Sequence, residues 1–209
     1  RLHLLRALPG TPFGLQCQQS AFASSETALL LGGIRGDALL PDELLRTDVE
    51  LRQVTLLGGG LIDLRADEST PAPLLLHLAT DRCWFVPTTG TVLVRHRLLT
   101  TVDDDHLAWD GAGNLVTGRS LLWQREIGMQ PDRMVEPGAS LFATSLASLE
   151  RPQLLDEPPA ALRPFLSGST GWERFEGSDL ATAAGQLPTG VPRRAGVLAD
   201  DLPRPAAMR

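Results

Sequence analysis

The sequence predicts an α+β fold dominated by an antiparallel β-sheet, with helices in the second half and an extended C-terminal tail. Three observations indicate it. All Val-rich segments of alternating polarity precede residue 131, most prolines lie from Pro131 onward, and the end of the chain has a linker's composition. We therefore expect a β-rich domain over residues 1–130, a helical and irregular part of the same domain over 131–185, and a tail over 186–209.

Several segments of the first part read as strands that pair with their sequence neighbours. Asp48–Leu57 and Leu61–Arg65 flank three glycines, which predicts a hairpin because only Gly adopts positive φ without cost. Across a short polar turn, His106–Trp109 is expected to pair with Leu115–Thr117. The strand Thr91–Leu99 places two groups of side chains on opposite faces: Val92, Val94, His96 and Leu98 on one, with Arg95 and Arg97 on the other.

Helical patterns are fewer, and no internal repeat of twenty to fifty residues is evident. The clearest helix candidate is Ala139–Arg151, in which apolar residues recur at helical spacing and Pro152 ends the run. The remaining short candidates are Ser25–Leu31, Pro41–Arg46, Pro159–Leu166 and Asp179–Gln186.

The charged residues exclude several mechanisms. The 209 residues carry a formal net charge of −6, and all 19 basic residues are Arg. Since there is no Lys, a P-loop lysine, a Schiff base and a lysine general base are excluded. An acidic chain disfavours direct binding to nucleic acid. The scarcity of residues with AT-rich codons indicates a bacterial, GC-rich genome, and two widely spaced cysteines favour reduced thiols and a cytoplasmic location.

No motif in the sequence assembles a catalytic, cofactor or metal site. Ser167–Gly171 departs from the nucleophile-elbow register, and Cys83 lies in an apolar strand, where burial raises the pKa of a thiol. His77, Cys83 and His96 lack a known metal-ligand spacing. We expect no cofactor, and whether the chain is an enzyme stays open, with a non-enzyme favoured. The alternative is a small hydrolase using His77, His96 or His106 with Asp103–Asp105.

Candidate contact residues come from two groups. Arg95 and Arg97 share a strand face that Arg119 could join, and a guanidinium group suits carboxylate and phosphate. The plainer interpretation is a solvated face with ion pairs to Asp103 or Asp110. Trp109 and Trp123, like Trp172, belong to a residue type enriched at interfaces.

Residues 77–122 resemble the final region of the small accessory subunit of type III-D CRISPR effector complexes. The similarity lies in Leu78-Ala79-Thr80 followed by Val86-Pro87, in the basic strand Val92–Leu99, and in the acidic turn leading to Gly113-Asn114 and Arg119. The resemblance implies a non-catalytic subunit that packs on other protein subunits around a guide RNA, with Arg95 and Arg97 as candidate contacts.

The functional hypothesis that follows is a non-enzymatic interaction or assembly subunit of a larger complex. Its tail would dock on the chain itself or on a partner, its partners would be other protein subunits, and no membrane would be involved. A CRISPR-type ribonucleoprotein subunit and the hydrolase are the two alternatives.

Overall fold

The computed structural model describes residues 5–6, 14–32, 46–65, 75–99, 107–118, 120–135 and 152–188. Within them the chain winds into four successive coils, and each coil contributes one strand to each of three sheets. The fold is a parallel β-solenoid. Coil by coil, the strands are β2 (Gly14–Gln18), β3 (Ala21–Ser24) and β4 (Leu29–Gly32); β5 (Arg46–Arg52), β6 (Thr55–Gly58) and β7 (Ile62–Arg65); β8 (Leu75–Asp81), β9 (Trp84–Pro87) and β10 (Val92–Leu98); and β11 (Leu107–Ala112), β12 (Leu115–Thr117) and β13 (Leu121–Ile127).

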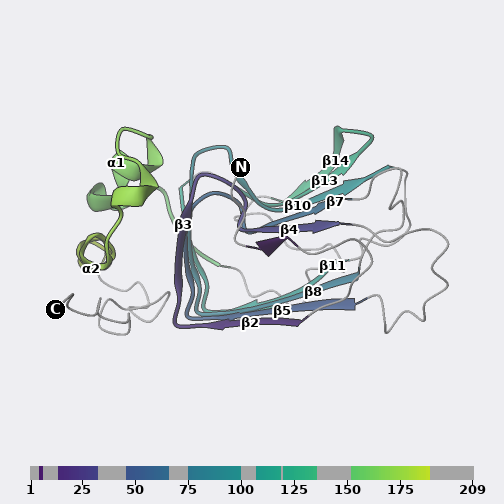
Figure 1. Ribbon diagram of the computed structural model, residues 1–209, viewed down its shortest axis with the longest axis horizontal. Coiled ribbons are helices and arrows are strands. Elements are labelled where there is room, and N and C mark those ends of the chain that lie inside the picture. Colours follow the sequence, from purple (N-terminus) through teal and green to yellow (C-terminus); the bar gives the residue numbers. More distant parts are fainter. Residues whose placement is uncertain are drawn as a thin grey trace.

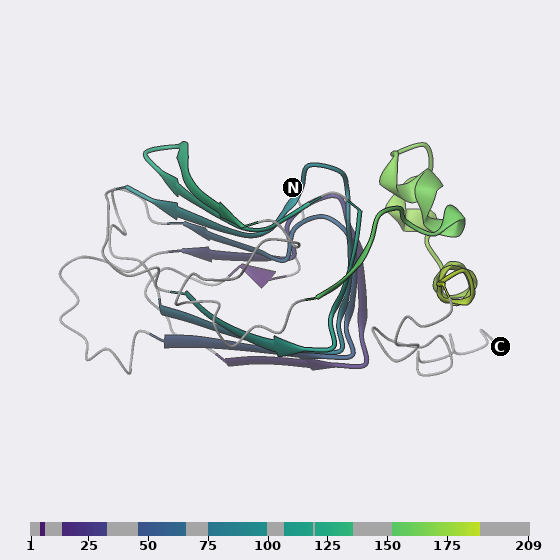
Figure 2. The same ribbon diagram turned by 180° about the vertical axis from the view of Figure 1, so that it is seen from behind.

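Stacking of equivalent strands forms sheets A, B and C. Sheet B has the order β11-β8-β5-β2, and sheet C the order β15-β12-β9-β6-β3, with β15 (Gln153–Leu155) at one edge. Sheet A has the order β1-β4-β7-β10-β13-β14, with β1 (Leu5–Arg6) and β14 (Gln130–Val135) at its edges. Sheets A and B lie opposite each other, and sheet C connects them at one side (Figures 1 and 2).

The predicted antiparallel sheet is wrong, although the chain is rich in strands as expected. Every described neighbouring pair is parallel except β13 and β14. The reason is physical: alternating polarity reports that one face of a strand is buried, and this holds for either strand direction. The short loops that predict hairpin turns are corners that lead into the next sheet.

The two predicted hairpins are wrong for that reason. The strands flanking Gly58–Gly60 are β6 and β7, which belong to sheets C and A. Leu107–Trp109 and Leu115–Thr117 likewise lie in sheets B and C.

The chain also contains the repeat that the sequence did not reveal. Equivalent positions are occupied by Gly14, Asp48, His77 and Ala108, which are 34, 29 and 31 residues apart.

The corner between sheets B and C is built in the same way in every coil. One residue there has a positive φ: Gln19 (49°), Gln53 (53°), Arg82 (51°) and Gly113 (63°). In three of the coils the backbone N–H of this residue donates to a backbone carbonyl oxygen of the next coil. Gln19 donates to Arg52, Gln53 to Asp81, and Arg82 to Ala112, at 2.8–3.0 Å. These bonds offset the cost of a left-handed conformation in a non-glycine residue.

The three glycines after β6 let neighbouring coils approach closely at the corner between sheets C and A. A Cβ on Gly59 would lie 1.9 Å from the carbonyl oxygen of Glu26 in the preceding coil. A Cβ on Gly60 would lie 2.6 Å from the carbonyl oxygen of Val92 in the following coil. Because both neighbours are backbone atoms, a side chain here would push the coils apart.

The interior is filled by columns of aligned apolar side chains from successive coils. In sheet C, Phe22, Leu56, Phe85 and Val116 lie in register; in sheet A, Leu29, Ile62, Val94 and Trp123 do the same. Most of these side chains are fully buried, together with Leu78 and Trp109 of sheet B. The predicted inward face of β10, with Val92, Val94, His96 and Leu98, is confirmed by their burial.

Four short helices cover the outer face of sheet C (Figure 1). They are η3 (Ala160–Leu162), α1 (Arg163–Leu166), η4 (Trp172–Arg174) and α2 (Gly177–Gly185). Leu162, Leu180 and Ala183 form a second buried cluster with the outward side chains of Leu57 and Trp84. The helices predicted over Pro159–Leu166 and Asp179–Gln186 are thereby confirmed.

The helix predicted over Ser25–Leu31 is wrong, because Leu29–Gly32 forms strand β4. A short apolar run has no periodicity that separates a helix from a buried strand. The helix candidate Ala139–Arg151 and the tail beyond residue 188 lie outside the described residues, as does Pro41–Leu45. None of the described helices has the length and apolar character needed to cross a membrane.

Candidate functional site on the outer face of sheet B

The outer face of sheet B carries polar side chains from neighbouring coils in register. Residues of β5, β8 and β11 that point away from the core alternate with buried ones. No described helix or strand lies against this face, in contrast to the outer face of sheet C (Figure 1). The outward residues are Asp48, Glu50 and Arg52 of β5, His77, Ala79 and Asp81 of β8, and Ala108, Asp110 and Ala112 of β11.

His77 lies between two carboxylates from the adjacent coils. Its Nδ1 is 3.0 Å from Asp48 Oδ1, and its Nε2 is 2.7 Å from Asp110 Oδ2. The register explains this arrangement: Asp48 is directly opposite His77, whereas Asp110 is opposite Ala79, two residues further along. Because an ionised carboxylate only accepts hydrogen bonds, both contacts are made together when both ring nitrogens carry a proton. The side chain of His77 thus links strands of three coils.

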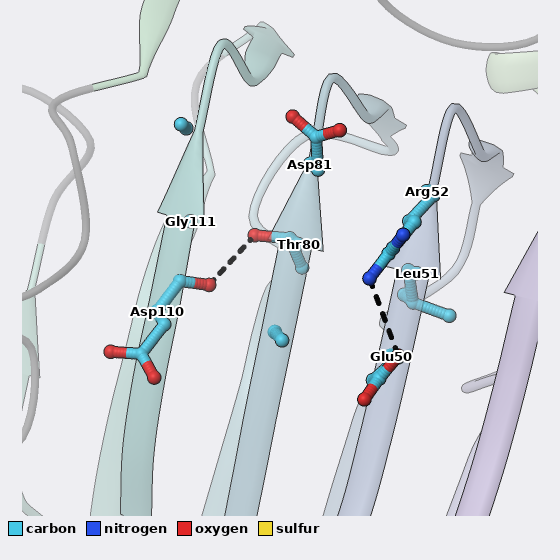
Figure 3. A pocket seen from close by; sticks show the side chains of 9 residues that line it. Glu50, Leu51, Arg52, Thr80, Asp81, Asp110 and Gly111 are labelled. Carbon is cyan, nitrogen blue, oxygen red and sulfur yellow. Dashed lines mark hydrogen bonds and ion pairs between the residues drawn. The ribbon is translucent and has the colours of Figure 1, made fainter.

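An open groove of about 430 Å³ runs across the same three strands, next to the corner with sheet C. Its rim holds Glu50 and Arg52, which form an ion pair at 3.8 Å, together with Asp81 and Asp110 (Figure 3). Two small outward residues from adjacent strands, Ala79 and Ala112, leave room between these groups. Thr80 points inward and donates to the carbonyl oxygen of Asp110 at 3.4 Å.

The charge of this face is acidic and accessible. Four carboxylates lie on it, and the side chains of Asp48 and Asp110 are each 46% exposed. The described arginines beside them are Arg52 and the corner residue Arg82. The guanidinium Nη2 of Arg82 donates a hydrogen bond of 2.9 Å to Asp81 Oδ2. The face therefore favours groups that are basic or donate hydrogen bonds.

The arginines that the sequence proposed as contacts lie on the outer face of sheet A. Arg95 and Arg97 share that face, as expected, and their described carboxylate partners are Asp63 and Glu126; Asp110 lies on sheet B, and Asp103 lies outside the described residues. Arg95 Nε lies 3.3 Å from Glu126, and Arg97 Nε lies 3.4 Å from Asp63 and 3.3 Å from Glu126. About a third of each Arg side chain remains exposed. Arg119 lies outside the described residues.

The two tryptophans proposed as contacts lie inside the solenoid. Trp109 and Trp123 are 2% and 1% exposed. Trp109 Nε1 donates to Thr80 Oγ1 at 3.0 Å, and the same hydroxyl accepts a bond of 2.9 Å from Asn114 Nδ2. Both side chains pack in the core of the fourth coil. The prediction that they contact a partner depended on their exposure to solvent, and the structure does not show that exposure.

Of the residues in the hydrolase hypothesis, the structure describes His77 and His96, and it does not bring these two together. His96 is 1% exposed and faces the interior from sheet A, whereas His77 lies on the outside of sheet B. His106 and Asp103–Asp105 lie outside the described residues. The partners of His77, Asp48 and Asp110, were missed. The signal that could have found them is the repeat of about thirty residues, which places Asp48 opposite His77 and Asp110 two residues beyond the position opposite His77.

The two thiols are free and shielded to different degrees. Cys83 is buried, its Sγ lies 3.4 Å from the carbonyl oxygen of Leu51, and burial raises the pKa of its thiol to about 12. Burial also raises the pKa of Cys17, which is partly exposed. A raised thiol pKa is the opposite of what a nucleophilic cysteine needs. Within the described part of the chain, no group of three or more His, Cys, Asp or Glu side chains is arranged to hold a metal ion.

Comparison with known proteins gives no match: no family model, curated protein or solved structure is significantly similar to this chain. The resemblance of residues 77–122 to the CRISPR accessory subunit therefore stays a prediction. In the structure these residues span β8 to the start of β13, which are most of the third and fourth coils.

Proposed function

We propose that this chain is a non-enzymatic binding subunit that contacts a partner protein through the outer face of sheet B. The observation that carries the proposal is the register of polar side chains from successive coils on that face. A stack of coils holds such side chains at fixed spacing on a rigid surface, as repeat proteins do when they bind extended partners.

The chemistry of the face indicates the kind of partner segment. Three partly exposed carboxylates, those of Glu50, Asp81 and Asp110, line the groove, and Arg52 is the cation on its rim. An extended segment with basic side chains would place them against Glu50, Asp81 and Asp110, while its backbone passes over Ala79. The neighbouring bonds of His77 to Asp48 and Asp110 hold two of the four carboxylates of this face in place.

The substitution Ala79→Arg tests this assignment, because it fills the groove and adds positive charge. The matched control is Ala181→Arg on the exposed side of helix α2. The full-length chain and both variants are immobilised and exposed to a lysate of the source organism. We expect a protein that is retained by the wild type and by Ala181→Arg and is lost with Ala79→Arg. A retained set that is identical for all three chains contradicts the proposal.

Footprinting of the carboxylates locates the contact independently. Carbodiimide labelling of Asp48, Glu50, Asp81 and Asp110 should fall when the captured partner is bound. Labelling of Asp156, which precedes the helices that cover sheet C, should stay constant. The interaction should also weaken as ionic strength rises from about 0.05 to 0.5 M, because exposed charges are screened over about 10 Å at 0.1 M. Protection confined to other acidic residues would overturn the assignment.

A second candidate function is supported by one specific contact, the histidine between two carboxylates. A histidine oriented by an aspartate can transfer protons to a bound substrate. Under this hypothesis Asp48 orients His77, and Asp110 borders the groove in which a substrate would lie. This site differs from the hydrolase predicted from the sequence, because Asp48 and Asp110 take the place of Asp103–Asp105. A hydrolytic activity abolished by His77→Gln would favour it over the binding subunit.

A further inference from the structure

A second cavity lies away from sheet B, between the solenoid and the helices that cover sheet C. It has a volume of about 760 Å³, within the range of small-molecule sites. One wall is the corner between sheets C and A, with Ser24, Ser25 and the turn Thr88–Thr91; the other is the segment Phe165–Glu173. We propose that this cavity binds a neutral saccharide.

The first argument is the density of hydroxyl groups. Seven of the lining side chains are hydroxyls, and they come from both walls: Ser24, Ser25, Thr88, Thr89, Thr91, Ser167 and Thr170. A hydroxyl has one donor and two acceptor sites, so a group that already donates to the protein still accepts from a ligand. Thr88 donates to the carbonyl oxygen of Gly58 at 2.7 Å, and Ser167 donates to that of Pro164 at 3.2 Å. Such groups match the adjacent hydroxyls of a sugar.

The second argument is an apolar wall held rigidly in place. Trp172 is stacked on Phe165 with ring centroids 5.5 Å apart, and it meets Phe175 edge to face at 5.9 Å. On the solenoid side it lies against Gly58, where a Cβ would come within 2.7 Å of the indole. A fixed apolar surface beside hydroxyl groups suits the C–H groups of a sugar ring, which alternate with its hydroxyls.

The third argument is the charge of the lining. Glu173 is the single ionisable residue among the fifteen that line the cavity. Its carboxylate lies against Gly171, since a Cβ there would meet the carboxylate oxygens within 2.2 Å. One carboxylate accepts strong hydrogen bonds from ligand hydroxyls and repels an anion. A quaternary ammonium group has no N–H or O–H to donate to the seven lining hydroxyls, so the cavity suits it less well than a sugar.

Titration of the full-length chain with four probes tests the proposal. The probes are two neutral trisaccharides, maltotriose and cellotriose, the anionic trigalacturonate, and choline; isothermal calorimetry measures binding up to about 20 mM. We expect saturable binding of at least one neutral trisaccharide, with a Kd of about 1 mM or tighter, and much weaker binding of the other two probes. No saturable response to either neutral sugar overturns the proposal, as does equal or stronger binding of trigalacturonate or choline.

Variants locate the binding. Glu173→Gln should weaken it about 5- to 10-fold through loss of the charge-assisted hydrogen bond. Gly171→Ala keeps the charge but displaces the carboxylate, and should weaken binding in the same direction. Asp156→Asn, an exposed carboxylate outside the cavity, is the matched control and should leave the Kd unchanged. Affinity that is the same in Glu173→Gln and Gly171→Ala as in the wild type would place the sugar elsewhere and contradict the assignment.

Discussion

At the scale of single residues, the place of a side chain in its coil decides its chemistry. Cys83 follows the positive-φ residue Arg82 and points into the core, where Val54 and Asn114 take the equivalent positions of the second and fourth coils. Asn114 Oδ1 accepts from the Cys83 backbone N–H at 3.0 Å, which joins the two coils. The thiol is therefore a packing group held away from water.

The raised pKa of Cys83 predicts a loss of stability at alkaline pH. The unfolded thiol ionises near pH 8.5–9, whereas the folded thiol keeps its proton up to about pH 12. Between these values the native state binds more protons, so its free energy of unfolding falls as pH rises, with a limiting slope of about 1.4 kcal/mol per pH unit. Urea unfolding between pH 8 and 10.5 should show this extra slope in the wild type. An equal slope in Cys83→Ala would contradict it.

Gly59 provides a second prediction at this scale. Gly59→Ala should lower the free energy of unfolding by about 3 kcal/mol or more, because the added methyl group would overlap the backbone of the preceding coil. Gly14→Ala in β2 is the control: a Cβ there meets nothing within 4 Å, so stability should stay within about 0.5 kcal/mol. Urea denaturation measures both. Equal effects of the two substitutions would show that the coils are not in close contact at this corner.

At the scale of elements, strand positions could be predicted from the sequence and their pairing could not. Segments such as Thr91–Leu99 were found because burial of one face imposes alternation. Parallel and antiparallel neighbours impose the same alternation, and a corner such as Gly58–Gly60 has the composition of a hairpin turn. The repeat was hidden because coil lengths differ and because aligned positions need only similar burial, as in the column Phe22, Leu56, Phe85 and Val116.

The candidate site was harder to predict for the same reason. Asp48, His77 and Asp110 are about thirty residues apart, and only the register of parallel coils brings them together. The exposure of Trp109 and Trp123 could not be judged either, because a large aromatic residue suits an interface and a core equally. By contrast, predicting that Arg95 and Arg97 share one face required only the alternation of side-chain direction along one strand.

The helices on sheet C give a prediction for this scale. Leu180 is fully buried in the cluster with Leu57 and Trp84, so Leu180→Ala should cost about 2–4 kcal/mol of unfolding free energy. Leu154→Ala removes the same atoms from a side chain that is 42% exposed and should cost less than half as much. Urea denaturation compares them. Equal costs would show that α2 does not pack on sheet C as described.

At the scale of the whole molecule, the described coils end differently in sheet A and in sheet C. In sheet A, β14 turns back on β13 through Gly128 and Met129, whose φ values are 54° and 70°. This strand is almost wholly exposed and contains Pro131, both features that discourage another strand from pairing with an edge. In sheet C, β15 adds one further parallel strand. The described coils thus end in an antiparallel strand in sheet A and in a parallel strand in sheet C.

Parallel coils bring Glu50 and Ala79 side by side on the outer face of sheet B, and the binding face depends on this register. Adjacent parallel strands lie about 4.8 Å apart, within the Cα separation that a disulfide spans. In the double variant Glu50→Cys, Ala79→Cys, mild oxidation should form an intramolecular disulfide, which peptide mapping by mass spectrometry identifies. The control Glu50→Cys, Ala108→Cys combines positions that are not paired and should form none. A disulfide in the control, or none between positions 50 and 79, would contradict the parallel solenoid and the binding face built on it.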